Sequence, residues 1–168
     1  MEKQLDSFIR HGSIDRLECV NILDIQRAIL RRQDVDIEYA IIKGDLNIIE
    51  FAMGSMVRTK GYIKIIYSNV FIVHGTLADR VKVDAQAILY AIAKGLDIDI
   101  ELADISGDLD TETIKRELGI DNLHDRKYKG YIIEGKINIH GSVIHEHVIF
   151  RDITFNKIVT FGASLIKS

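Results

Sequence analysis

Proline and tryptophan are absent from this chain, and cysteine occurs once, at Cys19. A single cysteine excludes an intramolecular disulfide, and with no signal peptide at the N-terminus we expect a reducing, cytoplasmic location. Cys19 lies in a stretch that we predict to be helical, where we expect it to be a small buried side chain. Because no proline interrupts the chain, every position can donate a backbone hydrogen bond, which suits long ladders of short strands.

Long apolar runs and clusters of basic residues are also missing. No run approaches the roughly 18 residues that a membrane-spanning helix needs, so we expect no membrane partner. The net charge is only -3, and we interpret the adjacent Arg31 and Arg32 as part of a solvated helix face. Proteins that bind nucleic acids usually carry a clustered basic excess, so we expect no nucleic acid either. The length of 168 residues fits a single domain.

An internal repeat with an offset of 63 residues runs through the chain. Residues 28–46 contain Ala-Ile, Asp-Val-Asp-Ile-Glu, Ala-Ile and Gly-Asp-Leu, and residues 91–109 contain Ala-Ile, Asp-Ile-Asp-Ile-Glu, Ala-Asp and Gly-Asp-Leu at the same places. A weaker third copy begins near Asp125, where residues 131–139 follow the pattern of residues 40–48. Repeats of this kind are typical of proteins in which similar units stack on one another.

Helical spacing and strand-like spacing alternate along the chain. Apolar residues recurring at three- and four-residue intervals predict helices over residues 13–33, 84–95 and 111–119. Ser13 is the expected N-cap of the first helix, Gly95 the expected end of the second, and Asp110 the cap of the third. The remaining segments are predicted as a first β unit at 34–83, a second β unit at 96–110, and coils at 128–168.

Within the β units, acids alternate with valine or isoleucine at residues 34–38 and 97–101, which predicts strands with one polar and one buried face. From Tyr62 onward the apolar residues come in short steps, separated by small residues such as Ser68 and Gly75. Such strands are too short for an ordinary sheet. Their near-constant spacing predicts a solenoid, in which each coil buries its inner face on the next coil.

The most specific pattern lies in the last third of the chain. Four large apolar residues are separated by five, six and five positions, and a smaller or apolar residue precedes each of them by two. The large residues are Phe150, Phe155, Phe161 and Ile166, and the preceding ones are Val148, Ile153, Val159 and Ser164. This rhythm resembles the pentapeptide-repeat family, and residues 161–166 are similar to its Phe-x-Gly-Ala-x-Phe unit. The two Gly-Asp-Leu segments resemble the lead-in found in such proteins.

The resemblance implies a right-handed β-helix of square cross-section whose central residues point inward. We therefore expect a mainly β fold with helices: a short right-handed β-helix with flanking or inserted α-helices. Its core or interface residues are expected to be Phe150, Phe155, Phe161, Leu165 and Ile166. No amphipathic cap follows Ile166, so we expect Phe161, Leu165 and Ile166 to contact a second copy in a homodimer, or to lie under the N-terminal helix.

His140, His145 and His147 are the candidate metal ligands. On a strand, His145 and His147 would point the same way, and His140 could approach from an adjacent corner; imidazole is a common zinc ligand. Solvated, outward-pointing histidines are the alternative. Because no acidic residue is placed to orient a ligand, we predict no metal and no other cofactor.

Two further motifs resemble binding sites without completing them. The acids at 34–38 and 97–101 lack the glycine and the final glutamate that a calcium-binding loop needs. Residues 130–136 read Gly-x4-Gly-Lys, but Ile137 replaces the Ser or Thr of a phosphate-binding loop and an extended segment follows. No arrangement of nucleophile and base is recognisable either, so we predict no catalytic residue.

We therefore expect a non-catalytic binding or scaffold protein whose partner is a second copy of itself or another protein. One alternative is a metal-dependent β-helical hydratase or hydrolase that uses His140, His145 and His147. The other follows from the resemblance, since some pentapeptide-repeat proteins mimic DNA and bind topoisomerases. That use depends on a long, strongly acidic rod, whereas this chain is short and carries a net charge of only -3.

Overall fold

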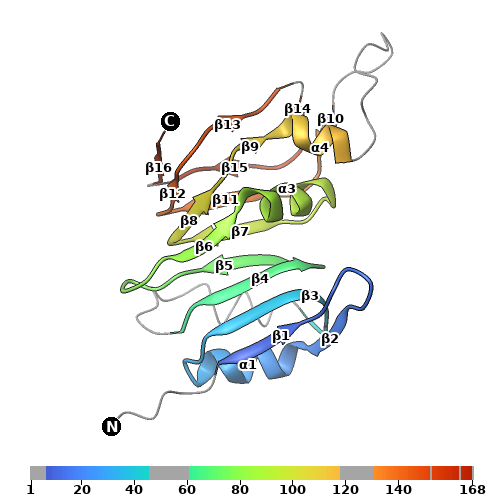
Figure 1. Ribbon diagram of the computed structural model, residues 1–168, viewed down its shortest axis with the longest axis vertical. Coiled ribbons are helices and arrows are strands. Elements are labelled where there is room, and N and C mark those ends of the chain that lie inside the picture. The colour runs from blue at the N-terminus through green and yellow to red at the C-terminus, as the bar shows by residue number, and fades with distance from the viewer. Residues whose placement is uncertain (1–6, 46–60, 118–130, 152, 163, 168) are drawn as a thin grey trace.

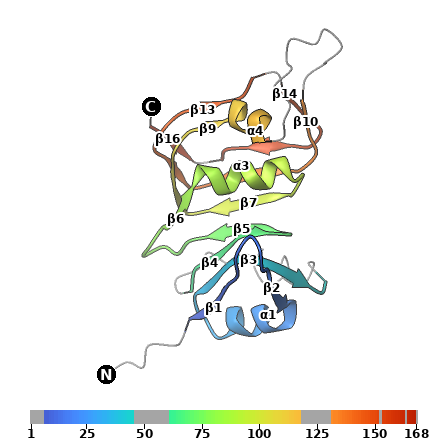
Figure 2. The same ribbon diagram turned by 45° about the vertical axis from the view of Figure 1, so that its right-hand side comes forward.

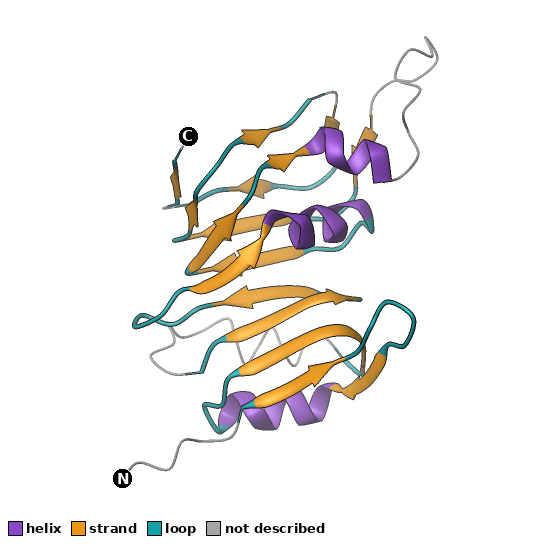
Figure 3. Ribbon diagram, in the orientation of Figure 1, coloured by secondary structure: helices purple, strands orange, loops and turns teal. Residues whose placement is uncertain are grey.

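The computed structural model describes residues 7–45, 61–117, 131–151, 153–162 and 164–167, and within them it is mainly β with three α-helices (Figures 1 and 3). The helices are α1 (Ile22–Leu30), α3 (Ala85–Ala93) and α4 (Thr111–Glu117). The strands of the first half are β1 (Phe8–His11), β2 (Glu18–Asn21), β3 (Val35–Lys43), β4 (Ile63–Ser68), β5 (Phe71–His74) and β6 (Val81–Asp84). Those of the second half are β7 (Ile98–Glu101), β8 (Ala103–Ser106), β9 (Leu109–Asp110), β10 (Tyr131–Ile133), β11 (Ile137–His140), β12 (Val143–Ile144), β13 (Val148–Ile149), β14 (Ile153–Phe155), β15 (Val159–Thr160) and β16 (Leu165–Ile166). The prediction of a mainly β chain with helices is confirmed.

The strands form one large sheet and three small ones. The large sheet has the order β1-β3-β4-β5-β7-β11-β15, with β2 also paired to β3, and the small sheets are β16-β12-β8-β6, β13-β9 and β10-β14. From β5 onward, consecutive strands belong to different sheets: β7, β8 and β9 lie in three of them, and β11, β12 and β13 pair with these in the same order. Figure 2 shows the resulting stack, from α1 at the bottom to β13 and β14 at the top.

The two repeat units begin their helices in the same way. The side chain of Asn21 caps α1 by accepting a hydrogen bond from the backbone N–H of Leu23, and Asp84 caps α3 by accepting one from Gln86. Asn21 and Asp84 are 63 positions apart, so the repeat extends to the cap itself. After α3, Gly95 takes the left-handed conformation expected of a residue that ends a helix, with φ at 76°.

The predicted helix over residues 13–33 begins later than expected, because residues 18–21 form β2. Ser13 is not the helix cap; it forms a turn in which its hydroxyl accepts a hydrogen bond from the backbone N–H of Arg16. Cys19 lies on β2 and is exposed, so the expectation of a buried, helical cysteine is wrong. The parallel pairing of β2 with β3 competes successfully with helix formation in this segment.

Left-handed residues stand at equivalent places in the two units, between β7 and β8 in the second unit and within β3 and β4 in the first. Leu102, between β7 and β8, has a φ of 51°, and Tyr39, its equivalent in the first unit, has a φ of 50°. The Tyr39 ring stacks on that of Tyr67, which is also left-handed, with 4.7 Å between the ring centroids. Gly75 follows β5, and a Cβ atom there would lie 2.0 Å from the carbonyl oxygen of Leu102. Neighbouring corners therefore approach so closely that this position excludes a side chain.

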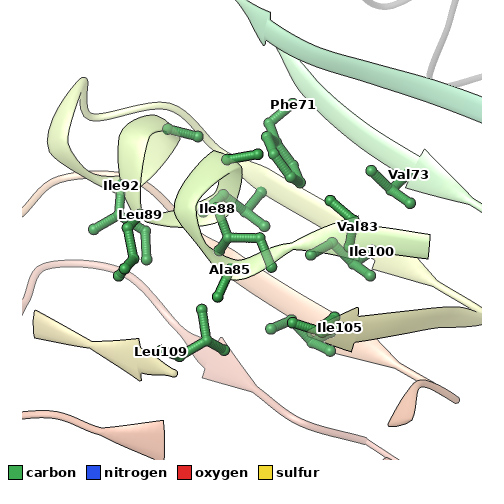
Figure 4. Packing of buried hydrophobic residues seen from close by; sticks show 14 of the residues in the cluster. Phe71, Val73, Val83, Ala85, Ile88, Leu89, Ile92, Ile100, Ile105 and Leu109 are labelled. Atoms are coloured by element: carbon green, nitrogen blue, oxygen red, sulfur yellow. The ribbon is translucent and has the colours of Figure 1, made fainter. Parts of the chain in front are cut away.

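Two hydrophobic clusters lie on opposite faces of the large sheet. The antiparallel pairing of β4 with β5 places Ile65 opposite Ile72, so Phe71 and Val73 point to the face opposite Ile65. Ile65 belongs to a cluster with the buried face of α1, and Phe71 and Val73 belong to a cluster with α3. In Figure 4, Ile88 and Leu89 of α3 lie among Phe71 and the side chains of neighbouring strands. Each repeat unit therefore has its own core.

The core under α3 gives a direct test of the packing. Ile88 is fully buried, with 0% of its surface exposed, and its truncation to alanine leaves a cavity that the surrounding strands cannot fill. We expect Ile88→Ala to lower the free energy of unfolding by about 2–5 kcal/mol in urea denaturation. The control Ile14→Ala removes the same atoms from a side chain that is 77% exposed and should change stability by less than about 0.5 kcal/mol. Equal effects of the two substitutions would contradict this packing.

Candidate functional site

A histidine and two carboxylates come together on the first unit of the large sheet. His11 ends β1, while Asp36 and Glu38 lie on β3, which pairs with β1 so that His11 is opposite Glu38. The Nε2 atom of His11 is 2.9 Å from Oδ1 of Asp36. One ligand atom from each of the three residues lies within 4.8 Å of the other two. Since Asp36 and Glu38 are two positions apart on a strand, their side chains leave the same face of the sheet.

The electrostatic balance of this cluster is incomplete. Oδ1 of Asp36 is buried; among the described residues it lies within ion-pair distance of His11 but accepts no hydrogen bond of regular geometry. Lys64 on β4 supplies one positive charge, with its Nζ 3.3 Å from Oε1 of Glu38. Nearby, burial and then the negative charges of Asp36 and Asp34 raise the pKa of Tyr62 above its ordinary value. The surroundings of Asp36 therefore carry negative charge that is only partly compensated.

The second unit contains the same three residue types, but there the histidine is buried. His74, Asp99 and Glu101 are the equivalents of His11, Asp36 and Glu38 at an offset of 63. The His74 ring is buried; its Nε2 lies 3.0 Å from Oδ2 of Asp99, and its Nδ1 lies 3.9 Å from Oε2 of Glu101. Asn138 of β11 donates a further hydrogen bond to Oδ1 of Asp99. Both carboxylate oxygens of Asp99 are therefore paired within the protein.

These contacts set the ionisation of Asp99. Burial by itself raises the pKa of a carboxyl group, but the hydrogen bond and charge of His74, the hydrogen bond of Asn138 and the charge of Lys136 together lower the pKa of Asp99 below its ordinary value. The ionised form is thus favoured in the folded state. The group of one histidine and two carboxylates is not repeated on the next strand, because β11 has Asn138 opposite Asp99 and His140 opposite Glu101.

The predicted metal candidates His140, His145 and His147 do not form such a group. His140 ends β11 and is exposed, whereas His145 and His147 lie between β12 and β13 rather than on one strand. The ring of His145 faces Asp104 at 3.7 Å, and that of His147 faces Asp108 at 3.1 Å. Within the described part of the chain, the group of three ligating side chains that could hold one metal ion is His11, Asp36 and Glu38.

The pairing of His147 with Asp108 has its own electrostatic consequence. The backbone N–H of His147 donates to Oδ1 of Asp108 over 2.9 Å, and the ring nitrogen Nδ1 lies 3.1 Å from the same oxygen. These hydrogen bonds lower the pKa of Asp108 below its ordinary value. His147 thus fixes the corner before β13 to the Gly-Asp-Leu segment of the second unit, which is a structural role.

The predicted core and interface residues lie at the C-terminal end of the stack. The ring of Phe150 contacts that of Phe155, with 5.3 Å between centroids, and that of Phe161 at 6.2 Å. Phe155 and Phe161 are partly buried against the core that contains α3. Leu165 and Ile166 on β16 are 54% and 46% exposed. The three phenylalanines therefore pack together, while the apolar side chains of the last strand are exposed to solvent.

Sequence reasoning missed His11 and His74. The repeat was matched from residue 28 onward, yet Phe-Ile-Arg-His at 8–11 and Phe-Ile-Val-His at 71–74 obey the same offset of 63. Extending the comparison toward the N-terminus would have linked both histidines to the acids of the Asp-x-Asp-x-Glu segments. The acids themselves alternate as predicted, with Val35 and Ile37 buried and Asp36 and Glu38 on the other face.

Comparison with known proteins adds no relative: no protein-family model, curated protein or solved structure matches this chain. Among the described helices, none has the length and apolar character needed to cross a membrane. Function is therefore inferred from the residues of this chain alone.

Asp99 makes the stability of the second unit dependent on pH. Because its folded pKa is lowered, its contribution is complete above the unfolded-chain value of about 3.9 and is lost as the pH falls through the folded pKa. Asp99→Asn should therefore be less stable than the parent protein at pH 7, and the gap between their urea midpoints should close as the pH falls from about 5 to 2. The side chain of Asp99 is 48% exposed, so solvent screening limits the size of the gap.

The control Asp15→Asn removes the same charge from an exposed loop residue, and its urea midpoint should follow that of the parent protein at every pH. A gap between Asp99→Asn and the parent that stays constant with pH would show that Asp99 contributes through packing rather than ionisation.

Proposed function

We propose that this chain is a non-catalytic, cytoplasmic scaffold protein, built around a short right-handed β-solenoid of the pentapeptide-repeat kind, that assembles with a second copy of itself. The assembly surface is the terminal coil, defined as residues 153–162 and 164–166 with strands β14, β15 and β16. The observation that carries the proposal is that these three strands each have an edge without a described partner, around side chains that are apolar and partly exposed.

The solenoid is supported by a constant step between paired strands. Partners in the parallel pairs β6–β8, β10–β14, β11–β15 and β12–β16 are separated by the same number of residues. That step is 22, as in the hydrogen bond from Thr160 to Asn138 and in the one from Ser142 to Ser164. Where the chain between α4 and β10 is inserted, the step becomes 39, as between Asn138 and Asp99. One coil therefore takes 22 residues.

The large apolar residues follow the sides of this coil. From Ile133 onward they recur at alternating intervals of six and five residues, which returns each of them to the same side after 22 positions. The set is Ile133, Ile139, Ile144, Phe150, Phe155, Phe161 and Ile166. Ile133, Ile139 and Ile144 are each at most 1% exposed. The five-six-five spacing that resembles the pentapeptide-repeat family is thus explained as the geometry of a four-sided coil.

The terminal coil lacks the cover that the earlier coils have. The inward position of Ile144 is 0% exposed, whereas Ile166, its register partner on the next coil, is 46% exposed. Ile158, in the turn before β15, is 69% exposed. At the other end of the stack, α1 lies against the first unit (Figure 1). Exposed apolar patches framed by unpaired strand edges favour association with another chain.

A second copy is the partner that fits these edges best. The edges of β14, β15 and β16 lie on three different sides of the coil, so a single added peptide strand could satisfy one of them only. A second terminal coil, related by a two-fold axis, presents edges on matching sides and an apolar centre of the same size. Two-fold contacts of this kind are self-complementary by symmetry.

Sedimentation velocity of the full chain tests the assembly. We expect a dimer for the parent protein and a shift of at least tenfold in the dimerisation constant toward monomer for Ile166→Glu, because the charge would be buried at the centre of the contact. Leu77→Glu alters a residue that is 66% exposed in the loop after β5 and should leave the dimer intact. A monomeric parent protein, or an unchanged dimer of a folded Ile166→Glu variant, would refute the proposal.

A further inference from the structure

We infer that His11, Asp36 and Glu38 form a binding site for a divalent first-row transition-metal ion such as Zn²⁺. This site lies on β1 and β3, at the end of the stack that bears α1, and is separate from the terminal coil. It is supplied by two strands whose register is fixed by parallel pairing, so the backbone already places the three side chains together. Loss of dimerisation would therefore leave it intact.

The distances are close to those of a metal site. Zinc bonds to nitrogen and oxygen measure about 2.0–2.2 Å, so neighbouring ligand atoms in a tetrahedral site are separated by roughly 3.4 Å. The ligand atoms of His11, Asp36 and Glu38 lie within 4.8 Å of one another, and His11 and Asp36 are in direct contact at 2.9 Å, a pair that an ion must open slightly to bind both. Small side-chain rotations suffice to bring all three onto one ion.

The Asp36 side chain is mostly buried and the His11 side chain is partly exposed, as a binding site that an ion enters from solvent requires. The Asp36 side chain is 19% exposed, and its Oδ1 atom accepts no hydrogen bond of regular geometry from the described residues. The partner of this oxygen is the His11 ring, at 2.9 Å, and a cation bound between the two side chains would coordinate the carboxylate oxygen and the imidazole nitrogen together. The His11 side chain is 44% exposed, which leaves a path for an ion to enter and room for water to complete its coordination.

The chemistry of the donors selects the class of metal. Calcium and magnesium prefer oxygen ligands throughout, whereas an imidazole nitrogen with two carboxylates suits zinc and other first-row divalent ions. Three protein ligands with further positions open to solvent are typical of sites that bind an exchangeable fourth ligand.

Lys64 competes with the metal for Glu38. Its Nζ lies 3.3 Å from Oε1 of Glu38, so metal binding must displace this ammonium group or force it to reorient. Removing the charge with Lys64→Met, which keeps most of the side-chain length, should therefore tighten zinc binding. If the cluster bound no metal, Lys64→Met would not change the affinity for zinc.

The second unit provides an internal comparison. His74 is buried, and Asp99 already accepts hydrogen bonds from His74 and Asn138. Both carboxylate oxygens of Asp99 are thus hydrogen-bonded, and the His74 side chain is only 7% exposed, which limits the access of an ion to its ring. The same three residue types thus form a closed structural network in the second unit and an open site in the first.

Isothermal titration with Zn²⁺ on the full chain tests the inference, in a Cys19→Ser background because Cys19 is exposed and could bind zinc itself. We expect one Zn²⁺ per chain, a melting temperature that rises with zinc, and at least a tenfold loss of affinity in His11→Ala. His147→Ala removes another exposed imidazole paired with a carboxylate and should bind zinc like the parent. Lys64→Met should bind at least threefold more tightly.

Absence of zinc binding at 100 µM metal would overturn the site, as would equal affinities of His11→Ala and the parent. Because the His11 side chain is 44% exposed, we expect His11→Ala to fold, which the melting temperature in the absence of metal verifies. If that variant fails to fold, Glu38→Gln replaces it, and undiminished zinc binding by Glu38→Gln would overturn the site equally.

Discussion

Parallel hydrogen bonding between strands distant in the sequence is the constraint on which the rest of this structure depends. The bonds from Ile137 to the carbonyl of Ile158 and from Leu165 to that of Ser142 fix the terminal coil against the one before it. Once the register is fixed, Ile133 lies beside Phe155 and Ile144 beside Ile166, and apolar side chains aligned in this way are removed from water together. A slip of one residue would turn these side chains outward, so register and core stabilise each other.

Local patterns predicted the parts of the fold that local physics decides. Alternation at residues 97–101 gave β7 correctly, because Ile98 and Ile100 are buried while Asp99 and Glu101 lie on the opposite face. The predicted start of the first helix was wrong because a distant contact decides it. Val20 fits a helical spacing, but it lies in a strand that pairs with β3, where Ile42 is its partner. Such long-range pairing leaves no trace in a short window of sequence.

The candidate site shows the same division. Asp36 and Glu38 were recognisable as a pair on one strand face, but His11 reaches them only through a pairing that spans 27 positions, from Phe8 to Val35. Conversely, His145 and His147 are close in sequence and were expected on one strand, yet they lie in a corner and face separate carboxylates. Distance along the chain is therefore a poor guide to proximity where each turn of the stack places residues 22 positions apart side by side.

Cross-linking of neighbouring coils measures this register most directly. Asn138 and Thr160 are partners on β11 and β15, so cysteines placed at both positions in a Cys19→Ser background lie within the Cα separation of about 4.4–6.8 Å that a disulfide needs. The parallel register of β11 and β15 predicts rapid formation of an intramolecular disulfide under mild oxidation, detected by thiol counting in mass spectrometry, and little for the out-of-register pair Asn138→Cys with Ile158→Cys. Free thiols in the first pair, or equal cross-linking of the two pairs, would contradict this parallel register and with it the proposed solenoid.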